Sequence, residues 1–120
     1  MRKWACFDKP CKYNDQQIFK VMIYETENEG VYLFLYNSPE AQISVVDEWY
    51  ESVIAATGKW ESYIKDKCWV VIDDPLPNCQ ADSTLPIRVK GRDIGKPEWG
   101  VYELLVDGKW VEYKEVISDI

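Results

Sequence analysis

The chain contains no histidine among its 120 residues, and this absence restricts its chemistry more than any other feature of its composition. Histidine is the usual general base near neutral pH and the commonest metal-binding side chain. Without it, the Ser-His and Cys-His pairs of nucleophilic catalysis cannot form. The phosphate-binding motifs G-x-G-x-x-G and G-x-x-x-x-G-K-[ST] and the G-x-S-x-G elbow are also missing. We therefore expect a protein that is not an enzyme and that has no cofactor.

Long apolar runs are absent as well. No segment approaches the roughly 20 apolar residues that are needed to span a bilayer. The basic start, MRKWACFDKPC, is not followed by the apolar stretch of a secretory signal. We therefore expect a cytoplasmic protein that does not bind membranes and whose thiols stay reduced.

Positive charge is scarce. The 14 lysine and arginine residues are outnumbered by 21 aspartate and glutamate residues, which gives a formal net charge of -7. Nucleic acids and anionic membranes repel such a protein. We expect no nucleic-acid binding, and the charge is compatible with a basic protein partner.

Aromatic residues, by contrast, are abundant, at 14% of the chain with six tryptophans. Each large aromatic side chain can bury about 150–250 Å², so a chain of this length can build much of its core from them. We expect residues 1–120 to form a single domain. The expected fold class is α+β, with a mostly antiparallel sheet of about six strands packed against one long or broken helix at 44–67.

The helix at 44–67 is predicted from the periodicity of SVVDEWYESVIAATGKWESYIKDK, in which apolar residues recur at steps of three or four. The stripe consists of Val46, Trp49, Tyr50, Val53, Thr57, Trp60 and Ile64. Ser44, followed three residues later by Asp47, resembles a capping box at the start of this helix. Gly58 costs about 1 kcal/mol relative to alanine inside a helix. Either the stripe carries the helix through this glycine, or two helices meet there.

Local patterns predict the strands and the loops. Alternating or continuous apolar patterns favour strands at 4–7, 16–26, 31–36, 68–73, 87–92, 101–106 and 109–113. The second and third of these form a predicted hairpin across ENEG. The last two form another across Asp107-Gly108, a dipeptide that suits a type I′ turn. Residues 9–15 and the proline-rich stretch 73–86 are expected to be loops.

The four cysteines allow one metal hypothesis, a tetrahedral zinc site made of Cys6, Cys11, Cys68 and Cys79. The spacings Cys-x4-Cys and Cys-x10-Cys fit a zinc knuckle poorly. Cys68 opens an apolar strand, where a buried free thiol is expected. Cys79 lies in the long loop as a candidate exposed thiol, without a histidine to lower its pKa. We therefore favour four unlinked cysteines and no metal.

The surplus of tryptophan favours a non-catalytic protein-binding or regulatory module. Interface hot spots are enriched in tryptophan and tyrosine, and the acidic charge would speed the encounter with a basic partner. The composition resembles that of small, acidic immunity and inhibitor proteins. The candidate contact residues are Trp49, Trp60, Trp99 and Trp110, although the helical stripe also explains Trp49 and Trp60 as core residues. Both a monomer and a homodimer are compatible with this sequence.

The alternative function is binding of a small anionic ligand, such as a phosphate or carboxylate, at a basic cluster in 88–96. The cluster consists of Arg88, Lys90, Arg92 and Lys96, with Trp99 as a stacking wall. In a strand at 87–92, the first three of these side chains share one face. Arginine binds phosphate and carboxylate through its planar fork of donors. We favour the competing interpretation, in which these side chains pair with surrounding carboxylates on a solvated face.

Overall fold

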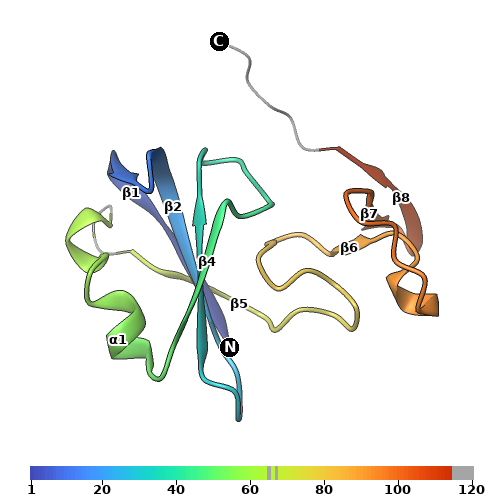
Figure 1. Cartoon of the computed structure of the whole chain (residues 1–120), viewed down its shortest axis with the longest axis horizontal. Coiled ribbons are helices and arrows are strands. Elements are labelled where there is room, and N and C mark those ends of the chain that lie inside the picture. Colours follow the sequence, from blue (N-terminus) through green and yellow to red (C-terminus); the bar gives the residue numbers. More distant parts are fainter. Residues whose placement is uncertain (65, 67, 115–120) are drawn as a thin grey trace.

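A computed structural model of the chain describes residues 1–64, 66 and 68–114, and this part of the chain is mostly β-structure (Figure 1). Here eight strands form two antiparallel sheets, one with five strands and one with three. The strands are β1 (Arg2–Tyr13), β2 (Gln16–Glu25), β3 (Val31–Tyr36), β4 (Val46–Tyr50), β5 (Val70–Ile72), β6 (Ile87–Val89), β7 (Tyr102–Val106) and β8 (Lys109–Tyr113). The described helices are α1 (Val53–Thr57) and the 3-10 helices η1 (Glu61–Tyr63) and η3 (Arg92–Ile94).

The five-stranded sheet has the order β4-β3-β2-β1-β5. Its centre is the hairpin of β2 and β3, and this prediction is confirmed. The hairpin turn is closed by Thr26, whose backbone N–H and hydroxyl both donate to the carbonyl of Gly30. Side chains of β2 and β3 are buried on both faces of the sheet, because a cluster of buried residues lies on each face.

Strand β1 is longer than predicted. The expected short strand at 4–7 and the loop at 9–15 are wrong, because β1 continues to Tyr13. The pairing of β1 with β2 shifts its register between Cys6 and Cys11, which is where Pro10 lies. Proline cannot donate to a ladder and is found in sheets at such irregularities. Pro10, which ends the predicted strand, therefore marks a bulge within the longer strand β1.

The predicted helix over 44–67 is wrong, and so is the sheet of about six strands packed against it. Residues Val46–Tyr50 form an edge strand, and α1 spans only Val53–Thr57. Along β4, burial alternates between half-buried and exposed side chains, with Trp49 on the exposed side. This period of two competes with the helical period over the same residues, and antiparallel pairing with β3 decides the outcome.

Ser52, and not Ser44, begins the helix. The hydroxyl oxygen of Ser52 accepts a hydrogen bond of 3.1 Å from the N–H of Ala55. Gly58 is the C-cap, so the helix ends at this glycine. The later part of the predicted stripe still describes burial, because Trp60 and Ile64 are both buried against the sheet.

The first face of the five-stranded sheet carries the larger core. Its buried residues are Ala5, Phe7, Ile18, Val21, Ile23, Val31, Leu33, Leu35, Ala56, Trp60 and Ile64. The sheet supplies most of them, and α1 and the segment after it cover this face. Trp60 is only 1% exposed, and its ring stacks on Phe7 with 5.8 Å between the ring centroids.

The opposite face packs against the loop that joins the two sheets. Met22, Phe34, Tyr36 and Ala41 form a second buried cluster, against which Ala81 of this loop packs. The loop at 73–86 contains no strand, as predicted, since β5 ends at Ile72 and β6 begins at Ile87. The side chain of Arg2 nevertheless holds it, through hydrogen bonds to the carbonyls of Asp73, Ala81 and Ser83.

The three-stranded sheet has the order β6-β7-β8. The predicted hairpin across Asp107-Gly108 is confirmed, with β7 and β8 paired and positive φ angles of 49° and 78° at the two turn residues. Both angles are what a type I′ turn requires. Among the described residues, no helix is long and apolar enough to cross a membrane.

Candidate functional site

The first residue of the predicted basic cluster, Arg88, is bound to protein partners. Its Nε lies 3.1 Å from a carboxylate oxygen of Glu103, and its Nη1 lies 3.4 Å from one of Asp93. The guanidinium also covers the ring of Trp110, 3.8 Å from the ring centroid. Arg88 therefore links β6, β7 and β8, and Trp110 serves as its packing surface.

Two of the three remaining basic residues also have protein partners. Lys90 lies 3.8 Å from a carboxylate oxygen of Glu98, and Arg92 donates a hydrogen bond of 3.2 Å to the side-chain carbonyl of Gln80. Lys96 makes no ion pair with any described residue. A small anion at this cluster would have to compete with the existing partners of Arg88, Lys90 and Arg92.

The tryptophans predicted to contact a partner have different environments. Trp60 lies in the core, and Trp110 lies under Arg88. Trp49 is about half exposed, yet its indole N–H donates a hydrogen bond of 2.5 Å to the carbonyl of Glu29. A Cβ atom added to Gly30 would lie 2.5 Å from the Trp49 ring, so this ring covers the β2–β3 turn directly. These three tryptophans therefore stabilise the fold.

Trp99 differs from them, because 75% of it is exposed. It lies on the loop between β6 and β7, where Ile94 is also 69% exposed. Neither side chain makes a hydrogen bond or ring contact with any described residue. Interface hot spots are enriched in tryptophan, and Trp99 is therefore the strongest candidate contact among those that the sequence singled out.

Backbone hydrogen bonds hold the loop that carries Ile94 and Trp99, which we call the 90–101 loop. The N–H of Lys90 donates to Val101, and that of Glu98 donates to Lys90, both at 2.8 Å. The N–H of Lys96 donates to Gly91 at 2.9 Å. Gly91 has a φ of 79°, and an added Cβ would lie 2.2 Å from the carbonyl oxygen of Lys96. A loop closed in this way presents its side chains without a large loss of conformational entropy on binding.

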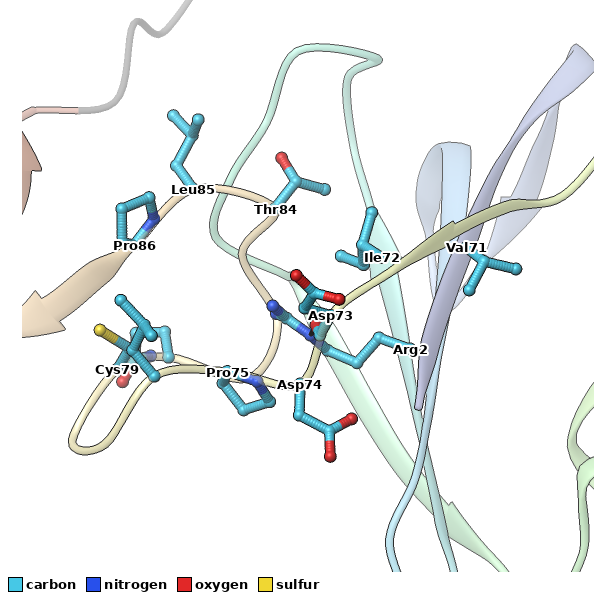
Figure 2. A pocket seen from close by; sticks show the side chains of 12 residues that line it. Arg2, Val71, Ile72, Asp73, Asp74, Pro75, Cys79, Thr84, Leu85 and Pro86 are labelled. Atoms are coloured by element: carbon cyan, nitrogen blue, oxygen red, sulfur yellow. Dashed lines mark hydrogen bonds between the residues drawn. The ribbon is translucent and has the colours of Figure 1, made fainter.

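A pocket of about 440 Å³ lies where the five-stranded sheet meets the loop at 73–86. Figure 2 shows it between the segment 71–75 and the segment 84–86, with Arg2 reaching into the space between them. Apolar and polar side chains both line it. They are Arg2, Val71, Ile72, Asp73, Asp74, Pro75, Leu76, Cys79, Gln80, Thr84, Leu85 and Pro86.

Arg2 holds this region together. Its Nε donates to the carbonyl of Asp73 at 2.7 Å, and its Nη1 donates to those of Ala81 and Ser83 at 3.0 and 2.6 Å. Burial lowers the pKa of the guanidinium, an effect opposed mainly by the field of Tyr36. Most of the donors of Arg2 are thus used by backbone carbonyls, and its role is to position the loop.

Glu48 forms a separate polar cluster on the first face of the sheet. Its carboxylate accepts hydrogen bonds from the hydroxyls of Tyr13 and Tyr50, the latter at 2.7 Å. The hydrogen bond to Glu48, followed by burial, raises the pKa of Tyr50 to about 12 and also raises the pKa of Tyr13. Both hydroxyls therefore keep their protons at neutral pH, and the cluster connects β1 to β4.

The cysteines are not gathered into a metal site within residues 1–64, 66 and 68–114. No group of three or more histidine, cysteine or carboxylate side chains there could hold an ion. Two burial predictions are wrong, because Cys68 is exposed whereas Cys79 is buried. Burial raises the pKa of the Cys79 thiol, which makes it a poor nucleophile. Cys68 precedes β5, and the first two residues of this strand, Val70 and Val71, are exposed as well.

Sequence reasoning did not find Arg2, Ile94, Val71, Leu76 or Leu85. The exposure of Ile94 could have been predicted from the sequence. It is an apolar residue in a polar loop, between Gly91 and Gly95, and it belongs to no strand pattern that would place it in the core. The others had no such signal, because the burial of Arg2 and the exposure of Val71, Leu76 and Leu85 depend on how the two sheets meet. Comparisons with known protein families, curated proteins and solved structures found no match to this chain.

Proposed function

We propose that the protein is a non-catalytic protein-binding module, and that it docks through Ile94 and Trp99 of the 90–101 loop. The observation that carries the proposal is the exposure of these two large apolar side chains, 69% and 75%, on a loop closed by its own backbone hydrogen bonds. A large apolar side chain on a rigid support is what an interface anchor requires.

The charge of the molecule favours a basic partner. With a formal net charge of -7, the protein attracts cationic surfaces at long range and speeds their encounter. The four cysteines are unlinked, as is usual in a reducing compartment, so the proposal assigns the module to the cytoplasm.

The proposal is tested by affinity capture from a lysate of the organism that carries the gene, comparing matched variants. Trp99→Ala and Ile94→Ala each remove an anchor. Ile54→Ala is the control, because Ile54 on α1 is 84% exposed but lies outside the loop. We expect a protein that is retained by the wild-type chain and by Ile54→Ala and is lost with either loop variant. A protein retained equally by all four chains would contradict the proposal.

A further inference from the structure

Strand β5 lies at an edge of the five-stranded sheet. It pairs with β1 through three residues, with Val70 opposite Trp4, Val71 opposite Lys3 and Ile72 opposite Arg2. On its other side, no strand of the described part of the chain pairs with it. An unpaired edge presents backbone donors and acceptors on which another extended segment can pair.

The hydrogen bonds at the start of β1 show which residue of β5 faces outward. Met1 and Glu25 exchange two hydrogen bonds, of 3.0 and 2.9 Å, so Met1 faces β2. In an antiparallel sheet, the N–H and C=O of one residue point to the same side, and the side alternates along the strand. Arg2 therefore faces Ile72 of β5. It follows that Val71 directs both its N–H and its C=O away from the sheet, toward solvent.

The surroundings of Val71 suit a bound peptide. Its side chain is 65% exposed, and it lies at the margin of the pocket shown in Figure 2. Leu76 and Leu85 also line this pocket and are exposed. Peptides that add a strand to a sheet edge gain affinity from backbone hydrogen bonds and specificity from adjoining side-chain pockets.

The overall charge of the chain, -7, favours a basic occupant, and Asp73 and Asp74 place two carboxylates directly after β5. The carboxylate of Asp73 makes no ion pair with any described residue, and Asp74 pairs with the N-terminal ammonium at 2.6 Å while its side chain stays 63% exposed. Two cations also lie on β1 beside β5, but neither pairs with the carboxylate of Asp73: Arg2 directs its Nε and Nη1 to backbone carbonyls, and Lys3 lies over the ring of Trp69 at 4.4 Å. A second copy of this chain fits poorly, because each copy carries a formal net charge of -7.

We propose that β5 binds an extended, basic segment of a partner protein as an added strand. The backbone of the segment pairs with the N–H and C=O of Val71. One apolar side chain of the segment enters the pocket beside Leu76 and Leu85, and a lysine or arginine reaches Asp73. This surface is separate from the 90–101 loop, and the two proposals stand on different observations.

The decisive variant is Val71→Pro. Proline is tolerated on an edge strand where the N–H faces solvent, so this substitution removes the outward donor and leaves the pairing of β5 with β1 in place. Val71→Thr is the matched control, because it changes the side chain and keeps the donor. The probe is a synthetic peptide of alternating valine and lysine, about eight residues long, titrated into isotope-labelled protein.

We expect the amide resonances of Val71 and its neighbours in β5 to shift saturably with the valine–lysine peptide. Val71→Pro should weaken binding about fivefold, the equivalent of one backbone hydrogen bond, and Val71→Thr should bind within about twofold of wild type. If Val71→Pro does not fold, a peptide N-methylated at alternate residues gives the same test on the wild-type protein. The methylated peptide should bind more weakly than the unmethylated peptide when its methylated edge is the one that faces β5.

Three results would overturn the proposal. The first is the absence of saturable shifts of the β5 amide resonances. The second is an unchanged affinity for the valine–lysine peptide, either after the Val71 donor is removed or after either edge of the peptide is methylated. The third is equal binding of a valine–glutamate peptide. Trp99→Ala separates this proposal from the proposed function, because it should leave the affinity for the valine–lysine peptide unchanged.

Discussion

The guanidinium of Arg2 donates a 2.6 Å hydrogen bond to the backbone carbonyl of Ser83, 81 positions away in the chain. The same side chain holds the carbonyls of Asp73 and Ala81. One residue of β1 therefore fixes both ends of the loop that joins the two sheets. The surface proposed for binding at β5 depends on this connection, because the pocket beside β5 is built from that loop.

Replacement of Arg2 should destabilise the protein. Arg2→Ala leaves three backbone carbonyls without their charged donor, and we expect the free energy of unfolding to fall by about 3 kcal/mol. Arg2→Lys retains the charge but cannot reach three carbonyls with one ammonium, so its loss should be intermediate. Urea unfolding measures both values. A stability of Arg2→Ala within roughly 0.5 kcal/mol of wild type, the range of ordinary surface substitutions, would show that these hydrogen bonds contribute little.

Gly30 and Trp49 should be energetically coupled. Gly30→Ala places a Cβ 2.5 Å from the Trp49 ring at a φ of 84°. The left-handed backbone alone costs about 1–2 kcal/mol for a residue other than glycine, and the collision adds to this cost. In a Trp49→Ala background the collision disappears, so Gly30→Ala should be less destabilising there. A double-mutant cycle measures the difference, and strict additivity would argue against the contact.

Two glycines of the 90–101 loop form a matched pair. Gly91→Ala introduces a Cβ 2.2 Å from the Lys96 carbonyl oxygen, whereas at Gly95, with a φ of 72°, no atom lies within 4 Å of an added Cβ. Gly95→Ala should therefore cost only the backbone strain, about 1–2 kcal/mol. Gly91→Ala should also open the loop, with faster hydrogen exchange at the amides of Lys96 and Glu98. Equal exchange rates in the two variants would mean that loop closure does not depend on Gly91.

Tyr50 should make folding stability fall at alkaline pH. Its pKa is raised to about 12 from the ordinary value of 10.0, mainly by its hydrogen bond to Glu48. Below pH 10 the hydroxyl is protonated in both states, and its contribution is fully present. Between pH 10 and about 12 the unfolded chain releases the proton and the folded chain keeps it, so this contribution is lost.

The measurement is urea unfolding of wild type and Tyr50→Phe across this pH range. The stability advantage of the wild type over Tyr50→Phe should shrink as pH rises. In a titration of ultraviolet absorbance, Glu48→Gln should let Tyr13 and Tyr50 ionise nearer to their ordinary pKa, because a neutral amide oxygen accepts a weaker hydrogen bond than a carboxylate and carries no charge. A constant difference in stability between wild type and Tyr50→Phe would contradict the assigned hydrogen bond.

Local signals in the sequence predicted the local parts of the fold. Asp107-Gly108 marks a turn whose backbone angles few other residues adopt, and the hairpin around it is present. The segment 44–67 was mispredicted because Trp49 and Tyr50 satisfy a helical period and a strand period at once. Pairing with β3 decides between them, and β3 is a separate segment of the chain. In the same way, Pro10 ended a predicted strand that in fact continues beyond a bulge.

The candidate sites were predictable only in part. The sequence predicts Trp99 as a contact residue because it is a tryptophan in a loop, and Trp99 is exposed. The charge of Arg88 predicts an anion site, but Glu103 lies opposite Arg88 on β7 and neutralises it. The outward donor of Val71 depends on which residues of β1 face β5, and no pattern within one segment contains that information.

The proposed function depends on contact between the 90–101 loop and another protein. Photo-crosslinking in the native cells tests this most directly, with p-benzoylphenylalanine placed at Trp99, at Ile94 and, as a control, at the exposed Ile54 of α1. We predict that the variants at 99 and 94 crosslink to one and the same protein and that the variant at 54 does not. No adduct at 99, or the same adducts at 54 as at 99, would contradict the proposed function.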